Sequence, residues 1–288
     1  MKIFIAAIAI TLLLTPPNRA VAKDILYSSY QSGNWEVWIV DSQGNRPRQL
    51  TRTSEEERYP AWSPDRKKIA YATNTGKIYL MDRDGKNKKL LTGISGKCDQ
   101  PAWRPKTNKL TFVSFTYRKG EHSDIREIDT ETSNKPVKIV SKKGVVNFPA
   151  WSPDGNRLVY ALFHRGPFEQ VIEELWIKDA IAETESPLIQ SGQENFQPDW
   201  SPDGRSIVFA SNTTGDYEIW VFYLDPARLV RLTDSPGFDG DPCWSPDGRK
   251  IAFVSTRSGK KQIWIMDKDG RNPHQLTRGR YESRDPDW

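Results

Sequence analysis

The chain has few residues of the kinds that build metal sites, disulfide frameworks or reactive thiols. Its 288 residues include only two cysteines, Cys98 and Cys243, and three histidines. Two cysteines cannot form a disulfide framework or a four-thiolate zinc site, and no two histidines stand at ligand spacing. A Gly-x-Ser-x-Gly nucleophile elbow and a Gly-x-x-x-x-Gly-Lys-Ser/Thr phosphate loop are also absent from the sequence. No motif therefore indicates zinc, serine-hydrolase or nucleotide chemistry, and we expect two free or buried thiols.

Charge of one sign is not in large excess. Lys plus Arg is 42 and Asp plus Glu is 37, a formal net charge of +5. A dedicated nucleic-acid binder would carry dense Lys/Arg blocks, so nucleic acid is not an expected partner.

Only one long hydrophobic run exists, at residues 3–14, and it is too short to span a bilayer. Lys2 precedes the run, and Ala20, Val21 and Ala22 follow it as a small-residue cleavage site. This pattern is typical of a secretory signal peptide, with an uncleaved anchor as the alternative. We expect residues 1–22 to be removed, residues 23–288 to form a periplasmic or secreted domain, and no transmembrane segment to remain. Without Lys2 and Arg19 the formal net charge is +3.

Tryptophan, by contrast, is abundant and periodic. Six of the eleven tryptophans end a Pro-x-Trp tripeptide, with spacings of 41, 48, 49, 44 and 44 residues: Trp62, Trp103, Trp151, Trp200, Trp244 and Trp288. A period in the forties made of short strands is typical of β-propeller blades.

Each repeat reads as four strands. Pro-x-Trp lies on the first strand, and the Ser-Pro-Asp-Gly that follows has turn chemistry, with Pro at the second turn position and Gly accepting the left-handed conformation. Two strands rich in β-branched and aromatic residues come next, and a fourth ends in Leu-Thr. The sequence therefore predicts an all-β chain of four-stranded antiparallel blades.

The ends of the repeat array predict how the ring closes. The chain enters its first unit at the second strand, residues 25–29, and stops within a first strand, residues 285–288. Pairing these two strands completes six four-stranded blades and removes the free sheet edges.

The repeated Pro-x-Trp-Ser-Pro-Asp-Gly resembles the TolB-type propeller, a relative of WD-repeat propellers. The full motif stands at residues 151–155, 200–204 and 244–248, and weaker forms stand at 62–66 and 103–107. The resemblance implies a periplasmic propeller that binds a peptidoglycan-associated lipoprotein and follows a separate N-terminal domain. Here only Lys23 separates the predicted signal peptide from the first strand, so we expect that domain to be absent. Similar propellers also occur beside peptidase domains and in oligosaccharide-degrading enzymes.

Repetition decides how the most conspicuous side chains are interpreted. The six Pro-x-Trp tryptophans could stack on sugars, but their fixed strand position favours packing between blades, as for Trp38, Trp176, Trp220 and Trp264. Trp35 lies outside both registers, so an exposed contact and local packing stay open. The turn aspartates recur, as a catalytic residue would not, and we interpret them as structural: Asp65, Asp154, Asp203 and Asp247.

Acidic residues gather before the repeat tryptophans. Eight acids and the three bases Arg58, Lys97 and Arg284 occupy the window from six to three residues before each Trp. The acids are Glu56, Glu57, Asp99, Glu194, Asp239, Asp241, Glu282 and Asp285. A mouth of this charge would accept a basic partner segment or a Ca²⁺ ion, and a solvated polar rim is the alternative.

The loops between the second and third strands should emerge on the same face as this mouth. They are longest in blades three and four, where they carry Arg118, His122, His164, Arg165 and Phe168. Length variation collects where a scaffold binds something or merely tolerates insertion.

We therefore expect an exported, non-catalytic propeller that recognises a protein or an envelope polymer through this face. A propeller enzyme acting on oligosaccharides or lactones is the main alternative, although few histidines are present to serve as bases. A purely structural subunit is the third.

Overall fold

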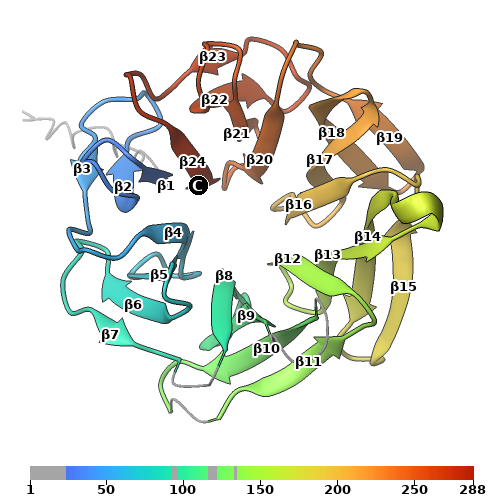
Figure 1. Cartoon of the computed structure of the whole chain (residues 1–288), viewed down its shortest axis with the longest axis horizontal. Coiled ribbons are helices and arrows are strands. Elements are labelled where there is room, and N and C mark those ends of the chain that lie inside the picture. Colours follow the sequence, from blue (N-terminus) through green and yellow to red (C-terminus); the bar gives the residue numbers. More distant parts are fainter. Residues whose placement is uncertain (1–23, 93–95, 116–121, 133–134) are drawn as a thin grey trace, which may run out of the picture.

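Six blades surround a central channel (Figure 1). The computed structural model describes residues 24–92, 96–115, 122–132 and 135–288. The predicted signal peptide and Arg118 lie outside the described residues. Within the described part, no helix is long and apolar enough to cross a membrane.

Every blade is a four-stranded antiparallel sheet, as predicted. From the channel outward, blade one comprises β24 (Ser283–Asp287), β1 (Ile25–Ser29), β2 (Glu36–Val40) and β3 (Arg48–Gln49). Blade two comprises β4 (Glu57–Trp62), β5 (Lys68–Thr73), β6 (Ile78–Asp82) and β7 (Lys89–Leu90). Blade three comprises β8 (Lys97–Trp103), β9 (Lys109–Phe115), β10 (Ser123–Asp129) and β11 (Val137–Ser141). Blade four comprises β12 (Val145–Trp151), β13 (Arg157–Arg165), β14 (Val171–Asp179) and β15 (Thr184–Ile189). Blade five comprises β16 (Asn195–Trp200), β17 (Ser206–Thr214), β18 (Asp216–Leu224) and β19 (Ala227–Arg231). Blade six comprises β20 (Asp239–Trp244), β21 (Lys250–Ser255), β22 (Gln262–Asp267) and β23 (His274–Gln275). One short 3-10 turn, η1 (Pro167–Glu169), joins β13 to β14.

The ring closes as the repeat predicts. β24 pairs antiparallel with β1, with Leu26 opposite Asp287 and Ser29 opposite Ser283. The closing strand begins at Ser283, two residues earlier than the sequence indicates. The last residues of the chain thus complete the sheet that the first described strand begins.

A bulge marks the inner strand of every blade. In β4, Tyr59 and Pro60 together face the single residue Tyr71 of β5, because the pairing skips from Arg58 to Ala61. The residue before each such proline has a left-handed backbone: Tyr59, Gln100, Phe148, Gln197, Asp241 and Asp285, with φ between 47° and 54°. Proline is tolerated here because a bulge on an inner edge strand needs no N–H donor.

The other repeat signatures satisfy backbone groups. In the Leu-Thr pair, Leu50 is buried and the Thr51 hydroxyl accepts a 2.8 Å bond from the Val37 N–H; three more blades repeat this contact. In the turns, the Asp65 carboxylate accepts from the Lys67 N–H at 3.1 Å, and Asp154, Asp203 and Asp247 do the same. The turn aspartates therefore cap their own loops.

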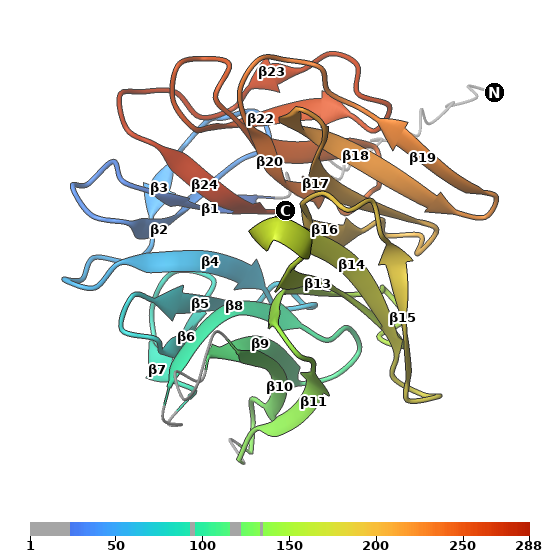
Figure 2. The ribbon, with the colours of Figure 1, turned by 45° about the vertical axis from the view of Figure 1, so that its right-hand side comes forward.

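The apolar core consists of six clusters between neighbouring blades, each including one Pro-x-Trp tryptophan. Trp62, Trp151, Trp200 and Trp244 are buried and Trp103 and Trp288 are half-buried. Both cysteines are buried free thiols. Figure 2 shows the β13–β14 and β17–β18 hairpins running along the side of the ring.

Candidate functional site

The central channel contains a cavity of about 330 Å³. Its wall is built from the inner-strand residues around each Pro-x-Trp. Four carboxylates line it, namely Asp199, Asp241, Asp285 and Asp287, and no Lys, Arg or His side chain is among the lining residues that the structure describes. The channel is therefore an acidic cavity in a chain whose formal net charge is positive.

The wall is polarised. The four carboxylates all belong to blades five, six and one, on β16, β20 and β24. Blades two, three and four contribute Tyr59, Gln100 and Phe148 at the bulge position and alanines just before the tryptophans. A cationic group entering the channel would meet carboxylates on one side and aromatic or neutral surface on the other.

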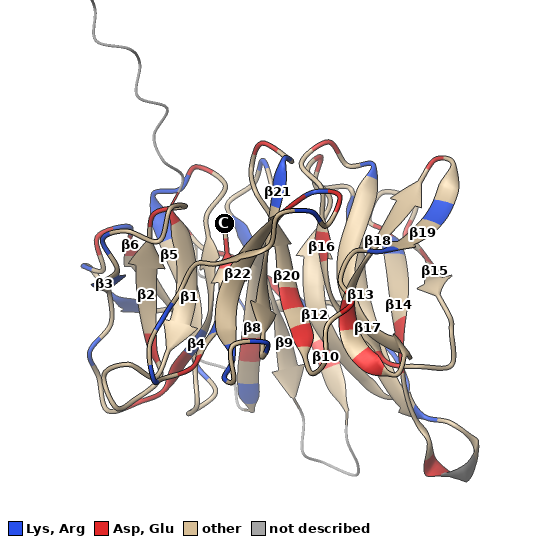
Figure 3. Cartoon of the chain, turned by 90° about the horizontal axis from the view of Figure 1, so that it is seen from above, with Lys and Arg blue, Asp and Glu red and all other residues tan. Residues whose placement is uncertain are grey.

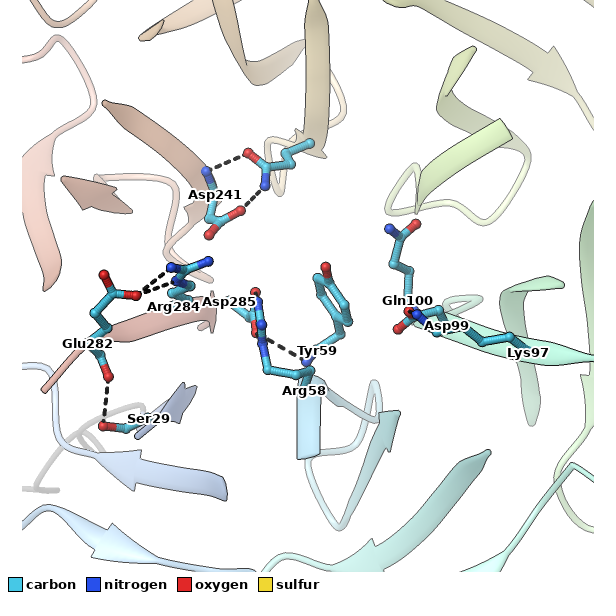
Figure 4. Close-up of polar contacts among 11 residues, drawn as sticks. Ser29, Arg58, Tyr59, Lys97, Asp99, Gln100, Asp241, Glu282, Arg284 and Asp285 are labelled. Atoms are coloured by element: carbon cyan, nitrogen blue, oxygen red, sulfur yellow. Dashed lines mark hydrogen bonds and ion pairs between the residues drawn. The ribbon is translucent and has the colours of Figure 1, made fainter. Parts of the chain in front are cut away.

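The bulges aim these side chains along the ring from one blade to the next (Figure 4). The Phe148 N–H donates to Gln100 Oε1 (2.7 Å), and the Asp241 N–H donates to Gln197 Oε1 (2.8 Å). The Tyr59 N–H likewise donates to Asp285 Oδ2 (3.4 Å). A left-handed non-glycine residue costs roughly 1–2 kcal/mol, and these bonds between blades offset part of that cost.

Asp241 and Asp285 sit side by side but differ in their partners. Arg58 holds Asp285 with two bonds, Nε–Oδ2 (2.6 Å) and Nη2–Oδ1 (3.0 Å), and thereby keeps the pKa of Asp285 below its usual range despite burial. Asp241 bonds the Gln197 amide and has no ion pair among the described residues. Burial and the neighbouring Asp285 charge raise the pKa of Asp241 to about 6.

Two further carboxylates were missed by the sequence analysis. Asp199 Oδ2 accepts from the Trp244 N–H and Asp287 Oδ2 accepts from the Trp62 N–H, both at 2.7 Å, so each links its blade to the next. Burial raises the pKa of both, that of Asp199 to about 7. Each stands immediately before a repeat tryptophan, at a position where the other blades have Ala or Cys. The window in which acidic residues were counted ends two residues before this position.

Among the other predicted mouth acids, Glu57, Asp99 and Asp239 are buried, so the alternative of a solvated rim does not describe them. Asp239 is 1% exposed and pairs with Arg257 at 2.6 Å, between blades five and six. Glu57 is also 1% exposed and lies beside Glu36 of β2. Asp99 is buried and pairs with Lys97 (3.0 Å), and half-buried Glu194 accepts from the Asn212 amide (3.0 Å). Figure 3 shows the acidic segments low on β8 and β20, within the ring wall.

The long-loop residues of blades three and four that the structure describes, His122, His164 and Arg165, do not join the channel. His122 contacts Asp124 (3.2 Å), His164 contacts Glu174 (3.7 Å), and Arg165 contacts Glu169 (3.4 Å). None of these residues lines the cavity, and η1 lies at the periphery of the ring (Figure 1). The backbone of Phe168 belongs to η1, and its side chain lies outside what the structure describes. His122, His164 and Arg165 are therefore separate from the predicted residues that line the channel.

An aromatic arc extends from the channel across blades four to six. Phe148, Phe196, Tyr217 and Phe238 follow one another with ring centroids 6.0, 5.4 and 5.6 Å apart, and all four are half-buried. Lys261 Nζ lies 3.8 Å from the Phe238 ring centroid. No repeat pattern indicates this arc, because its members occupy different positions of the repeat.

Trp35, left open by the sequence, packs locally and remains partly exposed. The Arg58 and Arg284 guanidinium carbons lie 4.6 and 5.2 Å from its ring centroid.

Among the described residues, no group of three or more His, Cys, Asp or Glu side chains is arranged to hold a metal ion.

Several buried acids predict how stability depends on pH. Burial raises the pKa of Glu57 and Glu173 to about 8 and that of Asp199 to about 7, from ordinary values of 4.5 and 3.8. The folded protein keeps protons that the unfolded chain releases, so this contribution is complete below the ordinary values and is lost as the pH rises through 7 and 8. The urea midpoint is expected to fall between about pH 6 and about pH 9.

Glu57→Gln should flatten part of that slope, because the uncharged amide needs no proton. The control variant Asp82→Asn should leave the slope unchanged, since the hydrogen bond from Lys68 lowers the pKa of half-buried Asp82, which therefore stays ionised over this range. A midpoint that stays level or rises over this range would contradict the assignment of protonated buried acids.

Comparison with known proteins places these features on a familiar scaffold. Residues 166–288 match the family model PD40, TolB beta propeller domain. TolB of Acinetobacter baumannii superposes with a TM-score of 0.79 and 22% identity over 92% of this chain and 66% of that one, so the chain spans less than two thirds of that TolB. A TolB-type protein of Agrobacterium tumefaciens superposes with a TM-score of 0.74 and 25% identity, over 88% of this chain and 89% of that one. Oligogalacturonate lyase of Vibrio parahaemolyticus superposes with a TM-score of 0.62 and 14% identity, over 88% of this chain and 74% of that one. No curated protein sequence matches the chain.

Proposed function

We propose that this chain, a TolB-like β-propeller, is an exported, non-catalytic binding protein of the cell envelope whose channel mouth receives a basic segment of a protein partner. The observation that carries the proposal is the channel wall, which has four carboxylates and no cationic side chain among its described residues. Carboxylates in a concave, partly desolvated site attract a positive group more strongly than they would in water.

The surroundings of the channel favour a protein as the partner. Asp199, Asp241 and Asp287 have hydrogen bonds but no ion pair among the described residues, so their charge is available to a ligand. The aromatic arc begins at Phe148 on the channel wall and offers a half-buried apolar surface beside it. Basic residues flanked by apolar side chains would use both features. Export follows from the predicted signal peptide, and the similarity to TolB supports it.

Binding of a basic probe tests the proposal. An oligolysine peptide should bind the full chain, and Asp241→Asn should weaken it about tenfold if one charge-assisted contact is lost. The affinity should rise from about pH 5.5 to about pH 8, because Asp241 and Asp199 must be ionised to attract a cation.

The matched control is Asp267→Asn, which removes an equal charge at the half-buried end of β22, away from the residues that line the channel. Isothermal titration calorimetry measures the oligolysine affinity of both variants at two salt concentrations, since screening weakens a charge-driven complex. Equal losses in the two variants, or binding that ignores pH and salt, would place the site elsewhere. A pull-down from envelope extract with the wild type and Asp241→Asn then identifies the partner.

The second candidate is a propeller enzyme acting on an oligosaccharide or lactone. One observation favours it: Asp199 lines the cavity with a pKa of about 7, which suits a general base. An activity screen with and without divalent metal separates the two functions, and turnover that disappears in Asp199→Asn but not in Asp241→Asn would favour the enzyme.

A further inference from the structure

A second concave surface lies outside the channel, at the seam where the last blade meets the first. Two cavities of about 630 and 410 Å³ adjoin there and share Arg280 and Tyr281, so they form one groove, called here the seam groove. It runs from the β2–β3 turn past the connection between β23 and β24 to Tyr30 and Trp35. Each of the two cavities has a volume within the usual range of ligand sites, about 300–1,000 Å³.

The groove is cationic, opposite in sign to the channel. Lys260, Arg278 and Arg280 line it and have no carboxylate partner among the residues that the structure describes. Its one acidic lining residue, Glu282, is paired with Arg284. An anionic ligand would thus meet three cations whose charge is not already neutralised by the protein.

The segment that carries these arginines is held in place by its backbone. Gly279 adopts φ +139°, which a side chain rarely allows, and so turns the chain between Arg278 and Arg280. Lys260 Nζ donates to the Arg280 carbonyl (2.8 Å), and Gln262 Nε2 donates to the Tyr281 carbonyl (2.6 Å). The exposed guanidinium groups therefore project from an anchored loop.

The rest of the groove wall is aromatic and uncharged. Tyr30 lies edge-on to Trp35 (5.7 Å between centroids) and 6.4 Å from Tyr281, and it is 38% exposed. The larger cavity adds amide and hydroxyl groups, including Gln43 and Asn45, and no acidic side chain. Aromatic rings pack against the C–H faces of sugars, amides bond their hydroxyls, and arginine binds carboxylates through paired N–H donors.

We propose that the seam groove binds an acidic glycan, a chain of sugars that bear carboxylates. The carboxylates would lie against Arg278, Arg280 and Lys260, and a sugar face would lie against Tyr30. An acidic peptide shares the charge, but it would not use the amides and the exposed ring in the same way. The seam groove shares no lining residue with the channel cavity, and the proposal does not rest on the function proposed for the channel.

The probe is an oligouronate of defined length, titrated into the full chain by calorimetry. The wild type should bind it more tightly than a neutral glucan or an oligoglutamate peptide of equal length. Arg278→Gln with Arg280→Gln should weaken oligouronate binding at least about tenfold, and Tyr30→Ala should weaken the oligouronate without changing the residual affinity for oligoglutamate.

The matched control is Arg205→Gln with Arg249→Gln, which removes two exposed arginines from turns of the other face. This control and the channel variant Asp241→Asn should keep full oligouronate affinity and an unchanged melting temperature. No oligouronate binding by the wild type, an equal loss in the control, or equally tight binding of oligoglutamate would each overturn the proposal.

Discussion

Removal of residues 284–288 is expected to prevent the propeller from folding stably. The truncation takes most of β24 away, so β1 becomes an open sheet edge of the kind that promotes aggregation. It also removes Trp288, which packs against the cluster between blades six and one, and the Asp285 partner of Arg58. Losing a large packed aromatic costs about 3–5 kcal/mol, and leaving a buried charge without its partner costs a similar amount. Together these approach or exceed a typical stability of about 5–15 kcal/mol.

Thermal unfolding and size-exclusion chromatography measure the effect. Trp288→Ala keeps the strand and its backbone pairing, so it should fold with a lower melting temperature and remain monomeric. Comparison of the two variants separates ring closure from the packing of one side chain. A truncated chain that stays monomeric and has the melting temperature of the wild type would show that the ring does not need its closing strand.

Asp239→Ala is expected to cause the largest loss of stability among the single substitutions considered. Asp239 is 1% exposed and bonds both Arg257 (2.6 Å) and the Ser235 hydroxyl (3.1 Å). Its removal leaves the Arg257 guanidinium without a carboxylate between two blades, which costs about 3–5 kcal/mol. For a chain of this size the melting temperature should fall by at least about 5 °C.

The double variant Asp239→Ala with Arg257→Met tests the mechanism, because it removes both charges and keeps apolar volume. It should regain part of the lost stability, since an apolar replacement of a buried pair is often neutral. Asp82→Ala and Asp267→Ala are the controls and should change little. A melting temperature that Asp239→Ala leaves unchanged would mean that the carboxylate is solvated after all, as the charge pattern alone had indicated.

The fold could be predicted from the sequence because its signals are local and repeated. Pro-x-Trp fixes the inner strand, since a proline suits a bulged edge strand, and Ser-Pro-Asp-Gly fixes the turn that follows it. Six such units, with one blade divided between residues 25–29 and the C-terminal strand, leave a closed ring as the arrangement without free edges. The position of the closing strand was therefore predicted to within two residues.

The acidic site could be predicted only in outline. The charge count found Asp241 and Asp285, which line the channel, together with Asp239 and Glu57, which pack between blades. Spacing alone does not separate them, because the left-handed bulge residue reverses the simple alternation of inward and outward side chains. The same count overlooked Asp199 and Asp287, whose carboxylates bond the backbone of the next blade.

The amino-acid sequence by itself determined the number of blades and their turn chemistry, because those depend on interactions within about forty residues. It also determined the closure of the ring, because the strand missing from the first unit of the repeat array is the one left over at the end of the last. Which charges stay free was decided by the tertiary structure. Arg58 of blade two neutralises Asp285 of blade one across 227 residues of sequence. Arg278 and Arg280 meet Tyr30 only where the last blade joins the first. Pairing across a seam depends on which blade is next in the ring, and no local pattern carries that information.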